Sequence, residues 1–299
     1  MSKLKTQEIE ISMGPQHPST HGVLRLIVTI DGEIIKSVTP DVGYLYRSME
    51  KIGEIVGYTG FQPYTDRIDY VCGMTCNHAY ALAVEKLAGI EVPERAEYLR
   101  VIAAELNRIS SHLIMAGCMA MDLGAFTPFV HAIRERESIN DLLEMICGAR
   151  LTYNYIRIGG VSHDAPKNFK EKCIEFINHF EPIVDEYNRL ISFNEIFIKR
   201  LKGLAPISKE DAIAYNIVGP NLRGSGVKWD LRRDIPYSIY PKLSFEIPVG
   251  NGDSYDRYMV RIREMQESAK IVRQAVSMLP DGEISAKVPR KIKPPVGEV

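Results

Sequence analysis

The sequence lacks the features that mark secreted or nucleic-acid-binding proteins. It has 5 cysteines in 299 residues, and a sparse, odd set of thiols indicates a reducing compartment rather than a disulfide framework. Its formal net charge is -1, which gives no electrostatic basis for binding nucleic acid. With 45% hydrophobic and 25% charged residues, the chain has the composition of an ordinary globular protein.

Long apolar runs and nucleotide-binding motifs are also missing. The longest apolar run, residues 113–121, is too short to cross a bilayer, and residues 1–14 lack the apolar core of a signal peptide. Gly159-Gly160 lacks the strand-turn-helix setting of a nicotinamide fingerprint. We therefore expect any membrane association to pass through partners, and we expect that the chain does not bind NADH by itself.

Hydrophobic periodicity predicts an α+β protein with a dominant helical bundle. Alternation over residues 7–11, and the runs at 23–30 and 33–38 on either side of Asp31-Gly32, predict a small antiparallel sheet with a hairpin. Apolar residues at spacings of three and four then predict helices over residues 44–56, 69–88, 94–121, 129–150, 169–190 and 258–279. Residues 219–252, rich in glycine, proline and aromatic residues, are expected to be irregular.

These patterns suggest three parts along the chain. We predict an N-terminal sheet subdomain over residues 1–43, packed on a helical core domain over residues 44–279. The basic, proline-bearing residues 280–299 are predicted to form an extended tail.

The first group of candidate residues is a stiff loop, GPQHPSTHG at residues 14–22. Its prolines and glycines disfavour a helix, and rigid loops can hold side chains in fixed positions. From the spacing alone, hydrogen bonding of His17 and His21 within the loop is the favoured interpretation. A zinc site is weaker still, because Pro18 disfavours the helix that would bring the two imidazoles together.

Cys72, Cys76 and His78 invite a metal hypothesis. On a helix, however, the two cysteines share a face while His78 points elsewhere, so small buried thiols are the favoured interpretation.

The helix predicted over residues 94–121 carries polar residues that need an explanation. Arg108 and His112 are one turn apart on one face, and the simplest interpretation is a solvated polar face. Asp122 follows very apolar sequence, so we expect it to be partly buried with a histidine partner. The run Arg134-Glu135-Arg136-Glu137 is expected to be a solvated helix face.

Six ordered blocks of sequence carry a family resemblance. They are GPQHPSTHGVLRL (14–26), TDRIDY (65–70), AVEKL (83–87), DLGAFTPFVHAIRERE (122–137), GARLTYNYIRIGG (148–160) and SGVKWDLR (225–232). Together, over residues 13 to about 279, the chain resembles the D, or 49-kDa, subunit of respiratory complex I. That family is similar in fold to the large subunit of nickel-iron hydrogenases, but has lost the metal ligands.

The resemblance implies roles for individual residues. His21 and Tyr70 match the pair that hydrogen-bonds the two carbonyls of the quinone headgroup, and Asp122 matches the carboxylate that partners this histidine. Arg67 matches an arginine beside a [4Fe-4S] cluster held by a partner subunit. His17, in the same loop as His21, joins the candidate cofactor-binding residues.

Three departures from the family pattern bear on these roles. Thr152 stands where many members carry a cluster-adjacent histidine, which predicts a lower and less pH-dependent cluster potential and fits a low-potential quinone such as menaquinone. Cys72 and Cys76 do not have the Cys-x-x-Cys spacing of hydrogenases. The sequence ends at Val299, where relatives continue, so we expect it to be a fragment.

As a function, the resemblance implies the quinone-binding core subunit of a proton-translocating NADH:quinone oxidoreductase. It implies menaquinone or ubiquinone as substrate, and no cofactor bound by this chain alone. The implied partners are a B-type iron-sulfur subunit, a C-type subunit and membrane-arm subunits, which would hold the chain peripherally on the cytoplasmic side of the inner membrane. The alternatives are a hydrogenase-type large subunit, a relative that accepts electrons from reduced F420 or ferredoxin, and a non-catalytic scaffold.

Overall fold

A computed structural model describes residues 7–16 and 22–299. It divides into two compact units, Met1–Ile55 and Val56–Val299. The N-terminal unit contains the antiparallel strands β1 (Glu8–Met13), β2 (Arg25–Asp31) and β3 (Ile34–Asp41), in the order β1-β2-β3. Gly32, at φ 63°, turns the β2–β3 hairpin where the Asp-Gly pair predicts it. The predicted small sheet and the α+β class are confirmed.

Helix α1 (Met49–Thr65) differs from the helix predicted over residues 44–56. Ser48 adopts the left-handed conformation at φ 52°, which interrupts a right-handed helix and fixes its start. Gly57 then breaks the helical path with φ 67° and ψ 179°, a conformation open to glycine alone. The prediction therefore began five residues too early and ended nine too early.

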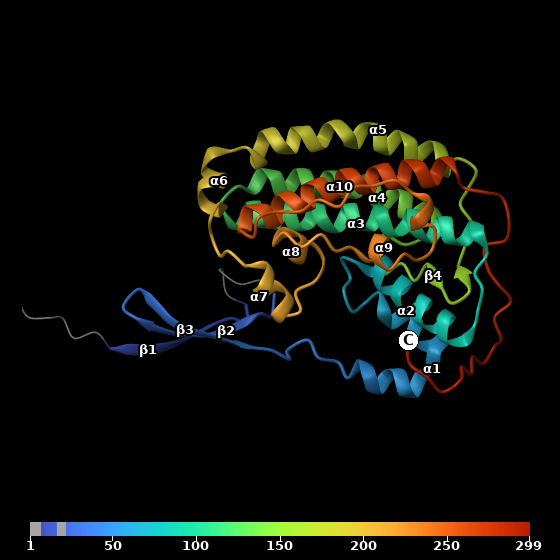
Figure 1. The fold of residues 1–299 in the computed structure, drawn as a ribbon, viewed down its shortest axis with the longest axis horizontal. Coiled ribbons are helices and arrows are strands. Elements are labelled where there is room, and N and C mark those ends of the chain that lie inside the picture. The colour runs from blue at the N-terminus through green and yellow to red at the C-terminus, as the bar shows by residue number, and fades with distance from the viewer. Residues whose placement is uncertain (1–6, 17–21) are drawn as a thin grey trace, which may run out of the picture. The chain divides into compact units, whose positions relative to one another are not determined.

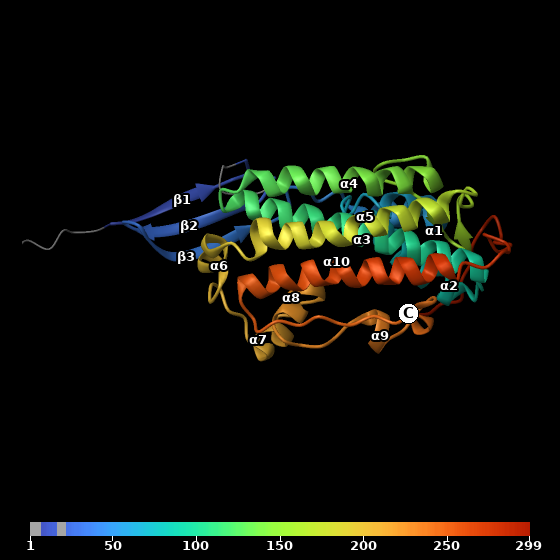
Figure 2. The same ribbon diagram turned by 90° about the horizontal axis from the view of Figure 1, so that it is seen from above.

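The second unit is built on helices α3 (Glu94–Asp122), α4 (Phe126–Cys147), α5 (Phe169–Tyr187) and α10 (Ser254–Ser277). They run alongside one another as a bundle (Figures 1 and 2). Helix α3 lies centrally and agrees with its predicted range to within one residue. Its stripe, including Leu99, Ile102 and Ile109, is fully buried; each such side chain contributes about 1.5–3 kcal/mol.

The other predicted helices shift at their ends because of local capping. Gly148, left-handed at φ 73°, ends α4 before Arg150, and the side chain of Asp253 accepts a hydrogen bond from Asp256 N and starts α10 four residues early. Short helices were not predicted: α6 (Glu195–Leu201), α7 (Lys209–Ala214), α8 (Gly219–Gly224) and α9 (Leu231–Asp234).

The C-terminal tail packs on a small hairpin, β4 (Ile156–Arg157) and β5 (Gly160–Val161). Val161 N donates to Ile284 O at 3.0 Å, and Ala286 N donates to Gly159 O at 2.8 Å. A Cβ at residue 160 would lie 2.1 Å from Ile284 O, so only glycine allows this approach. The tail thus adds a third backbone segment to the hairpin.

Within residues 7–16 and 22–299, no helix combines the length and the apolar character needed to span a bilayer.

Candidate functional site

The turn at residues 66–72 links α1 to α2 (Gly73–Ala88) and carries Arg67 and Tyr70. The helix predicted from residue 69 begins at residue 73, because the side chain of Asp69 accepts from Val71 N at 3.1 Å and closes a turn. Asn107 of α3 anchors this turn: its Oδ1 accepts from Met74 N, and its Nδ2 donates to Val71 O, both at 3.2 Å. Tyr70 is therefore held on a fixed turn.

The side chains of this turn reach the surface. Tyr70 is 61% exposed, and its hydroxyl has no hydrogen-bond partner in the described part of the chain. The side chain of Arg67 keeps 43% of its surface exposed. A phenol and a guanidinium three residues apart thus present a donor and a positive charge to whatever packs against this surface.

Asp66 is the first residue of the turn, and its side chain is fully buried. Its Oδ1 accepts from Arg67 Nη1 at 2.8 Å, and its Oδ2 accepts from Asn154 N at 2.7 Å. Burial raises the pKa of this carboxyl, while the Asn154 amide and Arg67 act in the opposite direction. The carboxylate connects the turn to the segment that contains Thr152.

That segment, residues 148–155, has a strained backbone. Thr152 and Asn154 adopt left-handed φ angles of 52° and 44°, which L-residues other than glycine rarely do. Thr152 is partly exposed. The structure therefore brings Arg67 and the Thr152 segment to one shared carboxylate.

Asp122 does not lie where the sequence suggested. It ends α3 and is exposed, so the expected burial is wrong. The apolar stripe passes through Ala120, and two further residues turn the side chain by about 200° around the axis. Ser111 contacts the turn at residues 66–72 through Cys72 and precedes Asp122 by eleven residues. Asp122 therefore lies about 16 Å further along α3 than the point where the helix meets the turn.

His17 and His21 lie outside the described residues, so the proposed grouping of His21 with Tyr70 and Asp122 stays a prediction.

Cys72 and Cys76 lie on the turn and the first turn of α2. Cys72 Sγ is 3.7 Å from Ser111 Oγ, and burial, with Cys72 nearby, raises the pKa of the Cys76 thiol to about 11. His78 points into the core, where burial lowers its pKa to about 3. Among the described residues, no group of three or more His, Cys, Asp or Glu could hold a metal ion.

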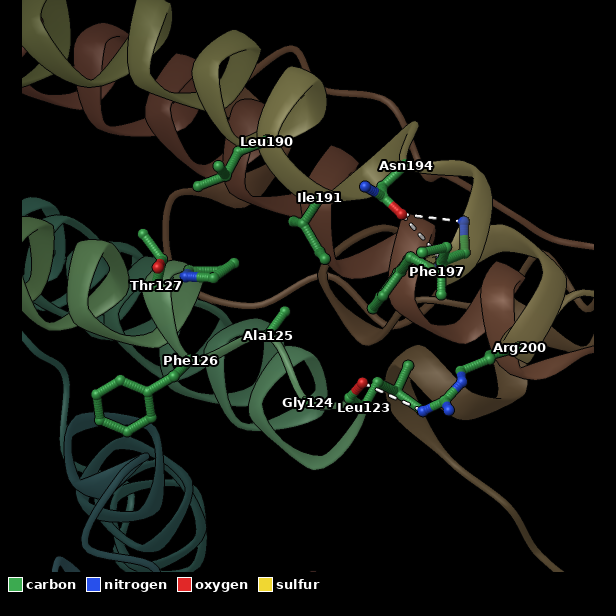
Figure 3. Close-up of a pocket in the computed structure, with 12 residues that line it drawn as sticks. Leu123, Gly124, Ala125, Phe126, Thr127, Leu190, Ile191, Asn194, Phe197 and Arg200 are labelled. Atoms are coloured by element: carbon green, nitrogen blue, oxygen red, sulfur yellow. Dashed lines mark hydrogen bonds between the residues drawn. The ribbon is translucent and has the colours of Figure 1, made fainter.

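A cavity of about 390 Å³ opens directly after Asp122 (Figure 3). The α3–α4 turn, the end of α5 and helix α6 line it, mostly with apolar side chains, and Arg200 Nη1 donates to Leu123 O at 3.2 Å on one side. Tyr70 does not line this cavity, so its geometry does not bear on the phenol.

The core of the bundle holds a buried ionic network centred on Glu105. Its carboxylate accepts from Arg232 at 3.1 Å, Tyr240 at 2.6 Å, Ser268 at 2.7 Å and Arg108 at 3.2 Å. Burial alone would raise the pKa of Glu105, but the two guanidiniums and the hydroxyl donors lower it to about 2. This carboxylate is ionised and satisfied.

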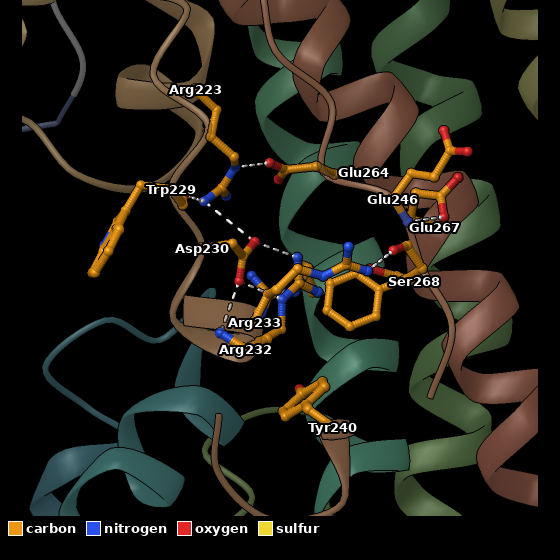
Figure 4. Close-up of polar contacts among 12 residues, drawn as sticks. Arg223, Trp229, Asp230, Arg232, Arg233, Tyr240, Glu246, Glu264, Glu267 and Ser268 are labelled. Atoms are coloured by element: carbon orange, nitrogen blue, oxygen red, sulfur yellow. Dashed lines mark hydrogen bonds and ion pairs between the residues drawn. The ribbon is translucent and has the colours of Figure 1, made fainter. Parts of the chain in front are cut away.

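The network continues through Glu264 on α10 (Figure 4). Its carboxylate bonds His112 Nε2 at 2.7 Å and accepts from Arg223 Nε at 2.6 Å. Arg223 approaches Asp230 at 3.4 Å, and Asp230 pairs with Arg232 at 2.7 Å. The predicted solvated face at Arg108 and His112 is therefore wrong, since both side chains join this interior network.

The predicted solvated run at residues 134–137 is also wrong at one position. Glu135 is buried and pairs with His179 at 3.0 Å and Arg134 at 2.6 Å. A carboxylate in an otherwise amphipathic run can turn inward when side chains, including one from a neighbouring helix, supply it with hydrogen-bond partners.

One sequence signal could have found the network. Glu105 lies three residues after Ile102 and four before Ile109, so it occupies the apolar stripe of α3. A charged residue on such a stripe needs partners from other helices.

Comparisons with known proteins agree over nearly the whole chain. The family model described as the 49-kDa subunit of respiratory-chain NADH dehydrogenase matches residues 122–299. The NADH-quinone oxidoreductase D subunit numbered 1 in Anaeromyxobacter sp. (strain K) is 60% identical over 98% of this chain and 79% of its own length. The D subunit numbered 2 in Sorangium cellulosum (strain So ce56) is 57% identical over 96% of this chain and 76% of its own.

A third relative, the NADH-quinone oxidoreductase D subunit of Bacillus cereus (strain ATCC 10987 / NRS 248), is 54% identical over 99% of this chain and 81% of its own length. Identity at this level, over this share of both chains, leaves no room for a different family. The chain belongs to the family of the 49-kDa, or D, subunit of NADH-quinone oxidoreductase, and is a subunit of that oxidoreductase complex.

Proposed function

We propose that this chain forms the quinone-binding part of the complex, with Tyr70 as the donor to one quinone carbonyl. The observation that carries this proposal is the Tyr70 phenol, 61% exposed on a turn that Asn107 anchors to the central helix. A rigid, exposed donor is preorganised for a ligand that arrives from outside the chain. His21 is the proposed donor to the second carbonyl, and Asp122 the carboxylate that supports that histidine.

The chemistry of quinone reduction explains why such donors matter. A quinone takes up two electrons and two protons to become a quinol, and negative charge develops on its oxygens as the electrons arrive. A hydroxyl aimed at one oxygen stabilises this charge and can pass its proton to it, after which the phenolate is reprotonated. An imidazole supported by a carboxylate can do the same at the other oxygen.

Arg67 is the proposed contact with the electron donor. An iron-sulfur cluster of a B-type partner subunit would supply the electrons one at a time. Arg67 offers this neighbour an exposed positive charge, and a positive charge nearby favours the more negative, reduced state of a cluster. Thr152 carries no charge, which supports a potential that is low and depends little on pH.

The location and the partners are also part of the proposal. We place the chain on the cytoplasmic side of the inner membrane, held by the B-type, C-type and membrane-arm subunits, with menaquinone as the favoured substrate over ubiquinone. The relatives are named as NADH-quinone oxidoreductase subunits, which favours this function over the hydrogenase alternative.

The test is Tyr70→Phe in the assembled complex. We expect quinone reductase activity to fall at least about tenfold, because the donor to the quinone oxygen is lost. Electron transfer from NADH to a small artificial acceptor that bypasses the quinone should stay unchanged. Tyr215→Phe is the matched control, since Tyr215 is also exposed, at 78%, and lies outside the turn. Full quinone reduction by the Tyr70→Phe complex would overturn the proposal.

A further inference from the structure

Asp66 is a buried charge whose partners are few and specific. It is fully buried, and a carboxylate without water needs donors to remain ionised. In the described part of the chain its hydrogen bonds to other residues come from Arg67 Nη1 at 2.8 Å and from Asn154 N at 2.7 Å. Each oxygen thus holds one partner, and the two partners come from segments 88 residues apart.

Both partner residues lie in segments that reach the surface and lack regular structure. Arg67 lies in the turn after α1 and also donates to Pro63 O, so its guanidinium is oriented at two points. Asn154 and Thr152 have left-handed backbones, a conformation of higher energy that persists only where neighbouring groups fix it. The carboxylate of Asp66 is such a group, because it accepts a hydrogen bond from Asn154 N.

The β4–β5 hairpin, which follows this segment in the chain, is fixed in a different way. Glu85 accepts from Gly159 N at 2.6 Å and pairs with Arg100 at 2.5 Å. Both of these charged groups are buried, so this second contact stabilises the hairpin without presenting charge to a partner. Asp66 differs because it joins the backbone contact to a guanidinium that reaches the surface.

We infer that Asp66 is a positioning residue for the surface, formed by Arg67 and the Thr152 segment, that faces the electron-donating cluster of the partner subunit. It fixes the exposed Arg67 guanidinium and the Thr152 segment in one arrangement against the partner's cluster. This inference deepens the proposed function and rests on it. A charge held in one place acts on the cluster at full strength, whereas a mobile arginine spends part of its time in solvent, where its field is screened.

The sign of the effect separates positioning from a simple charge effect. Asp66→Asn removes a negative charge, and this loss alone would make the cluster easier to reduce. If Asp66 acts through Arg67, the guanidinium loses its charged partner and is held less firmly beside the cluster, so the cluster becomes harder to reduce. The two explanations therefore predict shifts of opposite direction.

The experiment is a redox titration of the cluster in the assembled complex, followed by electron paramagnetic resonance. For Asp66→Asn we expect the reduced-to-oxidised ratio at a fixed potential to fall about three- to tenfold, at about 59 mV per tenfold change. Arg67→Gln should give a fall of at least the same size. The double variant should show no further fall beyond Arg67→Gln. An unchanged or increased ratio in Asp66→Asn overturns the inference.

Two further measurements separate the possible failures. Hydrogen–deuterium exchange at the Asn154 amide should become at least about tenfold faster in Asp66→Asn, because its acceptor is weakened. Asp230→Asn is the matched control: it also breaks a buried Asp–Arg pair, and it should change neither readout. If Arg67→Gln leaves the cluster unchanged, the proposed cluster contact itself is wrong, and the inference is overturned with it.

Discussion

The turn at residues 66–72 and the buried centre of the bundle each combine a tyrosine, an arginine and an acidic residue, but the environments of these residues differ. Tyr240 is 1% exposed and donates to Glu105, whereas Tyr70 is 61% exposed. Glu105 has donors on every side, whereas Asp66 holds one arginine and one amide. Buried charged groups whose hydrogen bonds are all satisfied stabilise one arrangement of the fold. Polar groups held at the surface by a rigid turn remain accessible to a ligand or a partner.

The pKa of the buried carboxyl group is shifted in opposite directions in the two regions. The pKa of Glu105 is lowered to about 2 by its cationic partners, against the effect of burial. The pKa of Asp66 is raised, because burial outweighs its two donors. Ionisation of Glu105 therefore stabilises the folded chain, while ionisation of Asp66 costs stability that the rest of the fold supplies.

The largest effect on stability is expected from Glu105→Gln. This change breaks the buried ion pairs of Glu105 with Arg232 and Arg108 and leaves Arg232 with Asp230 as its remaining carboxylate, and breaking a buried pair costs about 3–5 kcal/mol. The measurement is the thermal unfolding midpoint of the subunit in the assembled complex. Glu195→Gln, which removes an exposed carboxylate paired with Lys199, is the control and should leave the midpoint unchanged. An unchanged midpoint in Glu105→Gln would show that the network does not stabilise the bundle.

The next largest effect on stability is expected from acidification, because protonation of Glu105 and protonation of Asp66 change the stability with opposite signs. A lowered folded-state pKa means that Glu105 contributes its full stability above the unfolded value, about 4.3, and loses it as pH falls towards about 2. Asp66 has the opposite sign, because its raised pKa makes the folded state bind the proton more tightly. The unfolding midpoints of wild type and Glu105→Gln should therefore begin to converge below about pH 4.3 and continue to converge as the pH falls towards about 2. Parallel curves would contradict this assignment.

A matched pair of tyrosine substitutions sharpens the comparison further. Tyr240→Phe removes one donor from a buried carboxylate and should cost about 1–2 kcal/mol of folding free energy. Tyr70→Phe should cost less than about 0.5 kcal/mol, because the side chain is exposed. Both are read from thermal unfolding. Equal costs would mean that Tyr70 also has a structural role.

The smallest effect on stability is expected from Asp122→Asn. The carboxylate is exposed at the end of α3, so the unfolding midpoint should move by less than the equivalent of about 0.5 kcal/mol. Quinone reductase activity should nevertheless fall if the carboxylate supports His21. Wild-type activity in this variant would remove Asp122 from the proposed site.

The sequence predicts the parts of the fold that depend on local pattern. Helix α3 follows from its apolar stripe and the β2–β3 hairpin from Asp31-Gly32, because both signals lie within a few residues. Helix ends were less accurate, since side-chain caps such as Asp253 change them by a turn. Asp66 could not be recognised, because its partner Asn154 is 88 residues away and periodicity carries no information about such contacts.

The packing of the C-terminal tail on the β4–β5 hairpin affects the order in which parts of the chain can fold during synthesis. Val161 and Gly159 bond to residues 284 and 286, so this layer cannot form until the ribosome has translated the residues that follow α10, the last bundle helix. Contacts between residues so far apart in sequence form slowly and late. The hairpin layer is therefore completed no earlier than the last helix of the bundle.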